Sequence, residues 1–425
     1  MKSNPKPVFK RGNDVTSPRG KEPWPAARRL FFAVALACMS GQALAQFDGS
    51  VDPAAEDPVT DAPVVALADF DDPMLFRDRA LICGDVAASG TPIAGNAAGD
   101  GNSGEIDISG IPDTAAVVSA RLYWTVLTDD DQVSETGKTI SFAGNVVSGD
   151  MVGFAAETPC FTQANTVAWT ADVTSLVAAP GNGVYAVSGF PGSNNIAGGD
   201  FTEGVSLVIT YADAASTAKA VVSYEGLAVT NDPGETLNQT LEGFTAGGAV
   251  SASWIPVVGN GQVIGASDEL LEFAGGAGAV NLDSSLDGST AAFAAGTCSY
   301  LDQGGNTQCY WDDDLHDVSA AVSPGDVFAD VNYELGTDCH SFVAMDLAVS
   351  VDDAGACAIA AEQVDAACPP TDIWRNHGEY VSCVAHATEE ALAGLTCLSE
   401  EQLDDISGCV VSERAKSDVG KPDNG

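Results

Sequence analysis

Three groups of neighbouring aspartates carry the clearest chemical signal in the sequence. They lie at residues 69–72, at Asp129, Asp130 and Asp131, and at Asp312, Asp313 and Asp314. Crowded carboxylates repel one another, and a hard cation that takes roughly six to eight oxygen ligands relieves the repulsion. We therefore predict calcium, the one cofactor expected here, at the second and third groups. A hydrated loop without a metal is the alternative.

The histidines test the catalytic hypotheses, because the chain has only four. His316 and Asp317 are the residue types of a base and its orienting acid, but neighbours on a strand point to opposite faces. The sequence has no Gly-x-Ser-x-Gly nucleophile motif. His377 and His386 are nine residues apart, so on one helix they project to opposite sides and cannot share a metal. We expect no catalytic residues and no enzyme.

The loop from Trp311 to Asp317 is the site of the competing hypothesis, a carbohydrate-binding or hydrolytic protein. Trp311 follows Tyr310 and precedes the acidic run, so we expect it to be the most exposed aromatic residue. Trp124 lies on the apolar side of its strand, and we expect it in the core.

The charge balance excludes several partners. The 425 residues include 17 Lys and Arg against 60 Asp and Glu, a formal charge of −43. Between Lys138 and Arg375 the only basic residue is Lys219. Phosphate backbones and anionic lipids are bound through basic contacts, so nucleic acid and membrane surfaces are not expected partners. Other surface proteins, further copies of this chain and glycans remain.

The N-terminal segment and the cysteines predict export. Eight basic residues precede an apolar run at 30–39, and Ala43 and Ala45 supply a small-residue cleavage site. The run is too short to span a membrane, which takes roughly 20 residues, and no later stretch predicts a transmembrane segment. Cys38 lies in this leader, and the ten remaining cysteines are an even number, typical of disulfides. We expect a protein secreted or held at the cell surface, with the periplasm as the alternative, after cleavage near Ala45.

Periodicity predicts a mainly β chain between residues 78 and 352. In residues 118–126 one parity is apolar and the other mostly polar, the pattern of a strand with one buried face. Short β runs separated by Gly, Asn, Asp and Pro favour antiparallel sandwiches. Residues 169–181 resemble residues 315–326, which indicates a repeated unit. We predict a signal peptide (1–45), an acidic linker (46–75), two jelly-roll-like β-sandwiches (76–214 and 215–353) and a disulfide-bonded helical tail (354–425).

Several motifs resemble an uncharacterised family of secreted and surface-anchored microbial β-sandwich proteins. These motifs lie at residues 120–124, 169–176, 204–213, 258–262, 268–270 and 317–319. The resemblance covers roughly residues 80–352 and implies location and architecture only, because the family carries no established catalytic residues.

The tail predicts a helical hairpin. Residues 372–393 follow a helical period that ends at Gly394, and Ser399 with Gln402 forms a capping box for a second helix. Antiparallel helices bring Cys383 and Cys409 level, which predicts a bridge between them. The tail also resembles a small C-terminal module of exported bacterial proteins. Together these features predict a secreted acidic protein that binds or assembles outside the cell, with calcium as a proposed stabiliser.

Overall fold

Antiparallel strands make up most of the protein, and three small helices follow them, as a computed structural model shows. The structure describes residues 73–94, 102–129, 135–192, 199–261, 269–288, 300–301, 307–308, 310–337, 339–371 and 374–419. The prediction of a mainly β, antiparallel chain is confirmed. The signal peptide and almost all of the acidic linker lie outside these residues, and so do Asp130 and Asp131.

The largest sheet has ten strands in the order β17-β12-β20-β10-β1-β9-β3-β7-β6, with β18 also paired to β12. Every pairing in it is antiparallel. Its strands are β1 (Met74–Pro92), β3 (Ala116–Thr128), β6 (Asp150–Ala155), β7 (Asn165–Asp172), β9 (Gly204–Ala212), β10 (Ala218–Thr230), β12 (Ala252–Gly259), β17 (Trp311–Asp312), β18 (His316–Asp317) and β20 (His340–Ser350).

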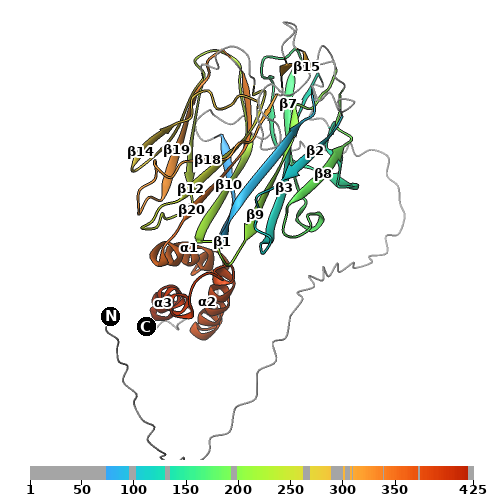
Figure 1. The fold of residues 1–425 in the computed structure, drawn as a ribbon. Coiled ribbons are helices and arrows are strands. Elements are labelled where there is room, and N and C mark those ends of the chain that lie inside the picture. The colour runs from blue at the N-terminus through green and yellow to red at the C-terminus, as the bar shows by residue number, and fades with distance from the viewer. Residues whose placement is uncertain are drawn as a thin grey trace, which may run out of the picture. The chain divides into compact units, whose positions relative to one another are not determined.

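Strand β1 joins the two halves of this sheet. Its first part, Met74 to Cys83, pairs with β10, and its second part, Gly84 to Pro92, pairs with β9 (Figure 1). At the changeover the backbone of Tyr211 lies against Gly84 so closely that a side chain there would collide with its carbonyl oxygen. One strand therefore belongs to both parts of the β structure.

Two four-stranded sheets flank the large one. The first has the order β2-β8-β4-β5 and the second the order β11-β19-β13-β14. Their strands are β2 (Ser103–Ile108), β4 (Thr139–Phe142), β5 (Asn145–Ser148), β8 (Gly183–Ser188), β11 (Thr236–Glu242), β13 (Leu270–Gly275), β14 (Gly278–Asn281) and β19 (Phe328–Glu334). A two-stranded pair, β15 (Tyr300–Leu301) with β16 (Thr307–Gln308), and a short helix, η1 (Thr174–Leu176), complete the β region. Strands β2, β11 and β19 largely alternate buried and exposed residues, as a sheet covered on one face requires.

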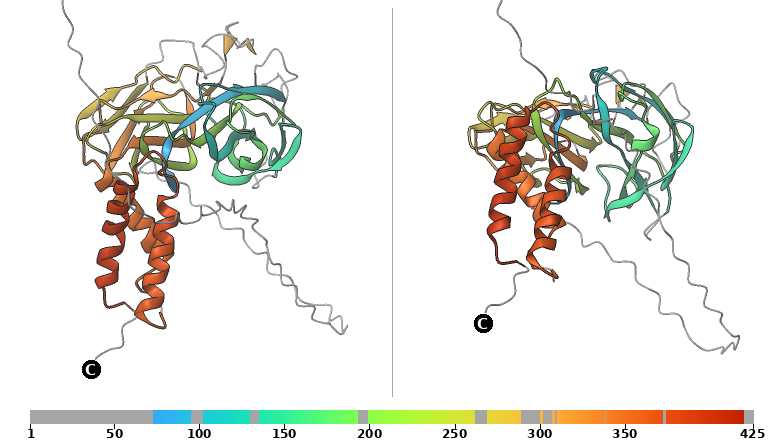
Figure 2. Two further views of the ribbon diagram at one scale, coloured as in Figure 1. Left: turned by 60° about the horizontal axis from the view of Figure 1, so that its bottom comes forward. Right: turned by 90° about the horizontal axis from the view of Figure 1, so that it is seen from below.

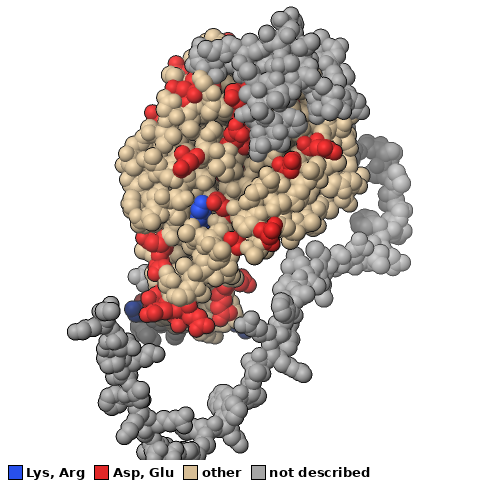
Figure 3. Space-filling model, viewed as in Figure 1, with Lys and Arg blue, Asp and Glu red and all other residues tan. Residues whose placement is uncertain are grey.

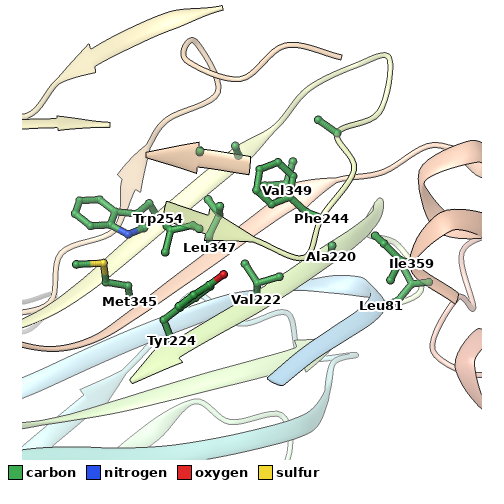
Figure 4. Packing of buried hydrophobic residues seen from close by; sticks show 14 of the residues in the cluster. Leu81, Ala220, Val222, Tyr224, Phe244, Trp254, Met345, Leu347, Val349 and Ile359 are labelled. Carbon is green, nitrogen blue, oxygen red and sulfur yellow. The ribbon is translucent and has the colours of Figure 1, made fainter. Parts of the chain in front are cut away.

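Hydrophobic clusters fill the spaces between the sheets. One holds Trp124 from β3 of the large sheet and Phe142 from β4 of the first flanking sheet. Another holds Trp254 and continues to the helices, and Figure 4 shows Ile359 from the helical tail beside Leu81 at the helical end of this cluster.

A third cluster joins the two halves of the ten-stranded sheet. It contains Tyr123 and Val208 from one half and Val257 and Val343 from the other. The two halves therefore pack against each other through apolar side chains.

Three helices form the tail: α1 (Asp353–Ala367), α2 (His377–Leu392) and α3 (Glu400–Lys416). Each contacts the other two, and Figure 2 shows them grouped together. The capping box of Ser399 and Gln402 is confirmed. The two predicted helices form as α2 and α3. The prediction missed α1, which the Ala-rich segment after Asp352 forms, with the Asp352 carboxylate accepting from the Gly355 amide at 3.0 Å.

Four disulfides are present among the described residues. They join Cys83 to Cys397, Cys160 to Cys339, Cys357 to Cys409 and Cys368 to Cys383. The predicted bridge between Cys383 and Cys409 is wrong, because α1 and its end bring a nearer partner to each of these cysteines. Cys298 and Cys309 lie outside the described residues. Within the described ranges, no helix combines the length and the apolar content that crossing a membrane requires.

Candidate functional site

Trp311 lies inside the protein, so the expectation of an exposed aromatic residue is wrong. Its side chain is fully buried, and its Nε1 donates to Ser206 Oγ at 2.7 Å. The indole ring lies against Gly204, where a side-chain carbon would collide with it. Pairing of β17 with β12 draws the ring into the space between the two halves of the large sheet. The free energy gained by burying the large indole ring exceeds the cost of bringing the acidic residues that follow it close to the interior.

Two of the three aspartates after Trp311 are also buried. Asp312 Oδ2 accepts from the Gly288 amide at 3.2 Å, and Asp313 Oδ2 accepts from Ser206 Oγ at 2.5 Å. Burial raises the pKa of Asp312 well above its ordinary value, and the neighbouring carboxylates, Asp314 first, add to the increase. The crowding that the sequence predicts is therefore present at this loop.

Calcium at these aspartates stays a prediction. Asp129 is exposed at the end of β3, and its two neighbours lie outside the described residues. Among the residues that the structure describes, no group of three or more His, Cys, Asp or Glu side chains is arranged to hold a metal ion.

Glu203 is a buried acid that the sequence analysis did not single out. Its Oε2 accepts from Thr125 Oγ1 at 2.8 Å and from Ser341 Oγ at 3.3 Å. Its Oε1 is buried and has no hydrogen-bond partner in the described part of the chain. Burial raises the pKa of Glu203 to about 8, because water no longer solvates the charged form. In the sequence, the sign of this buried acid was its position directly before the apolar run that forms β9.

A second buried acid, Asp346, lies in the apolar strand β20. Its Oδ1 accepts from Ser223 Oγ at 2.5 Å, and burial raises its pKa to about 7. Nearby, Tyr123 OH donates to Glu225 Oε2 at 3.4 Å, and Arg77 Nε lies 3.3 Å from the same oxygen. A carboxyl group in the middle of an apolar strand was the signal for this cluster.

His316 and Asp317, the residue types of a base and its orienting acid, have different partners. Asp317 Oδ1 instead accepts from Ser319 Oγ at 2.6 Å and from the Ser319 amide at 3.0 Å. His316 packs against the Trp254 ring at 5.7 Å, and burial lowers the pKa of His316.

The other histidines occupy separate environments. His340 is buried with its Nδ1 2.6 Å from Tyr333 OH, and burial lowers the pKa of His340 to about 4. His377 contacts the carbonyl oxygens of Ala415 and Val419, whereas His386 is exposed on α2.

Two grooves open where the β sheets meet the helices. One has a volume of about 540 Å³. It is lined by Phe76 and Arg79 of β1, by Val327 just before β19, and by Glu362 of α1. The other, of about 750 Å³, lies beside Asp352 and the segment that leads to α3.

Comparisons with known proteins leave the function open. No family model matches the chain, and no curated protein does. Among solved structures, the major capsid protein P2 from bacteriophage PM2 matches at a TM-score of 0.17 and 10% identity, over 62% of this chain and 97% of that chain. The ANXUR2 extracellular domain from Arabidopsis thaliana matches at a TM-score of 0.17 and 8% identity, over 66% of this chain and 90% of that chain.

Structural similarity at this level carries no argument about function. The mainly β architecture agrees with the resemblance to a β-sandwich family, whereas membership in that family stays a prediction.

Proposed function

We propose that this is an exported acidic protein that acts by binding or assembly outside the cytoplasm. The supporting observation is the set of disulfides that join distant parts of the chain. Cys83 and Cys397 are 314 residues apart, and Cys160 and Cys339 are 179 residues apart. Such bonds form and persist in oxidising compartments outside the cytoplasm.

The positions of these bonds support a structural or adhesive role. Cys160, after β6, belongs to one half of the β structure, and Cys339, before β20, belongs to the other. Cys83 in the middle of β1 is bonded to Cys397, between α2 and α3. Each part of the molecule is thereby linked covalently to the next, which suits a protein that must hold its shape outside the cell.

We interpret the β region as two sandwiches that share β1. Each flanking sheet covers one half of the ten-stranded sheet, and each resulting pair encloses its own apolar cluster. This arrangement supports the proposed sandwiches at residues 76–214 and 215–353, except that residues 76–83 of β1 pair with β10 of the second sandwich.

The contacts of the loop from Trp311 to Asp317 favour binding or assembly over hydrolysis. Trp311 serves the packing between the halves, and Asp317 holds the turn at Ser319. These roles use the residues that a hydrolytic site in this loop would need as its platform and its orienting acid.

Calcium is a proposed stabiliser at Asp312, Asp313 and Asp314. Calcium should raise the melting midpoint above that in EGTA, since a ligand at about 100 times its dissociation constant stabilises by about 2.7 kcal/mol. Asp314→Asn should reduce the shift, whereas Asp107→Asn, on the exposed side of β2, should leave it unchanged. Identical curves with calcium and EGTA would remove calcium from the proposal.

Fractionation of the producing cells tests the location. The tagged chain should be found in the medium, at the surface or in the periplasm, with its N-terminus at or near Gln46. An uncleaved chain confined to the cytoplasm would contradict the proposal.

A further inference from the structure

The groove of about 540 Å³ has the size of a small-molecule site, for which the usual range is roughly 300–1,000 Å³. Its apolar side is accessible: Phe76 is 50% exposed and Val327 is 51% exposed. The Phe76 ring meets the buried Tyr224 ring edge-on, with centroids 5.6 Å apart. This contact holds the Phe76 ring in place while half of the side chain stays open to a ligand.

The other side of the groove carries charged groups that already bond to one another. Arg79 Nη1 donates to Glu362 Oε2 at 2.8 Å and to the Gly243 carbonyl at 3.0 Å. The Arg79 side chain is 11% exposed and the Glu362 side chain 70% exposed, so the guanidinium is largely buried while the carboxylate faces solvent. Glu242, at the end of β11, is exposed and lines the same groove. Donors and acceptors therefore lie side by side, next to an aromatic ring.

We propose that this groove binds a neutral saccharide, an inference that rests on the proposed binding function. A sugar ring has an apolar face of C–H groups that packs on an aromatic ring such as Phe76. Its neighbouring hydroxyls both donate and accept, so one accepts from Arg79 Nη2, since Nη1 already donates to Glu362 and Gly243, while the next donates to Glu362. Hydrogen bonds to charged groups are roughly twice as strong as those between neutral groups.

The charge of the molecule favours a neutral ligand over an anionic one. A formal charge of −43 repels anionic polymers. Figure 3 shows Asp and Glu over the visible face and gathered around the helices. Inside the groove a cationic peptide would meet the carboxylates of Glu242 and Glu362 as well as the guanidinium of Arg79, so it is the competing occupant that the test must distinguish. A neutral saccharide is repelled by none of these charges.

The test is a titration of the full exported chain with neutral oligosaccharides: cello-, laminari-, manno-, xylo- and galacto-oligosaccharides, followed by calorimetry and ligand-observed NMR. At least one series should bind, and Phe76→Ala should weaken it by about tenfold. Glu362→Gln should weaken the same ligand. The matched controls are Phe328→Ala, a phenylalanine 49% exposed outside the groove lining, and Glu401→Gln on α3; both should bind as the unmodified chain does.

Three results would overturn the proposal. One is binding of none of the five series, and another is binding that Phe76→Ala and Glu362→Gln leave unchanged. The third is a Lys- and Arg-rich peptide that occupies the groove in a Phe76-dependent way while the saccharides do not. Melting curves and the disulfide pattern, measured on each variant, show that it is folded. Export and disulfide formation are measured separately, so failure of saccharide binding leaves the proposed location untouched.

Discussion

Glu203 and Asp346 are carboxyl groups buried inside this protein. Burial raises the pKa of Glu203 from 4.5 to about 8 and that of Asp346 from 3.8 to about 7. The folded state therefore holds each proton more tightly than the unfolded chain. The contribution of each group to the free energy of unfolding is full below its unfolded pKa. This contribution falls as the pH rises from the unfolded to the folded pKa, and it is lost above the folded pKa. His340 acts in the opposite direction between about 6.5 and 4, because burial lowers its pKa.

Glu203→Gln should remove the contribution of Glu203 to this pH dependence. An amide has no proton to lose, and its oxygen can still accept from Thr125 and Ser341. We expect the variant to lose less stability than the parent from pH 5 to pH 8, where one proton contributes at most about 1.4 kcal/mol per pH unit. Melting midpoints across this range measure it, with exposed Glu105→Gln as the control. Parallel curves for parent and Glu203→Gln would contradict the burial of an uncharged Glu203.

Gly204 should tolerate no side chain, because the Trp311 ring lies against it. Gly204→Ala forces the indole or the strand to move, and overpacking of this kind costs about 1–3 kcal/mol. Thermal unfolding should show the loss. Gly248→Ala, where a side-chain carbon meets no atom within 4 Å, should melt as the parent does. An unchanged midpoint for Gly204→Ala would mean that Trp311 lies elsewhere.

At the scale of elements, the cap of α3 contributes measurably to the tail. Ser399 Oγ accepts from the Gln402 amide at 3.3 Å, and Gln402 Oε1 accepts from the Ser399 amide at 3.2 Å. Ser399→Ala should destabilise the helices by about 0.5–2 kcal/mol. Hydrogen exchange of the first-turn amides measures the effect, and Ser407→Ala, in the middle of α3, serves as the control. Unchanged exchange rates would show that the cap contributes nothing.

Local pattern predicted the elements whose cause is local. The alternation of residues 118–126 indicated a strand with Trp124 inside, and Trp124 is fully buried. The spacing of Ser399 and Gln402 likewise predicted the start of α3.

Features that depend on distant partners were missed. The hydrogen-bond partners of Glu203 are Thr125 and Ser341, which lie 78 and 138 positions away from it in the sequence. Trp311 is buried by β9 and β12, and the cysteine pairs of the tail depend on α1, whose Ala-rich sequence gave no clear period. Short-range periodicity carries no information on which strands or helices become neighbours.

At the scale of the whole molecule, an excess of carboxylates surrounds a covalently connected interior. The two halves meet through apolar residues and are bonded at Cys160 and Cys339, while β1 is bonded to the tail. Each disulfide that closes a long loop stabilises the fold by about 2–4 kcal/mol, because it restricts the unfolded chain. An acidic surface repels other acidic molecules.

Disulfide mapping of the protein recovered from outside its own cells tests the central claim most directly. The unreduced protein is alkylated, digested and analysed by mass spectrometry. We predict peptides linked through Cys160 and Cys339 and through Cys83 and Cys397. Recovery of these four cysteines as alkylated free thiols would contradict an exported protein held together by covalent bonds.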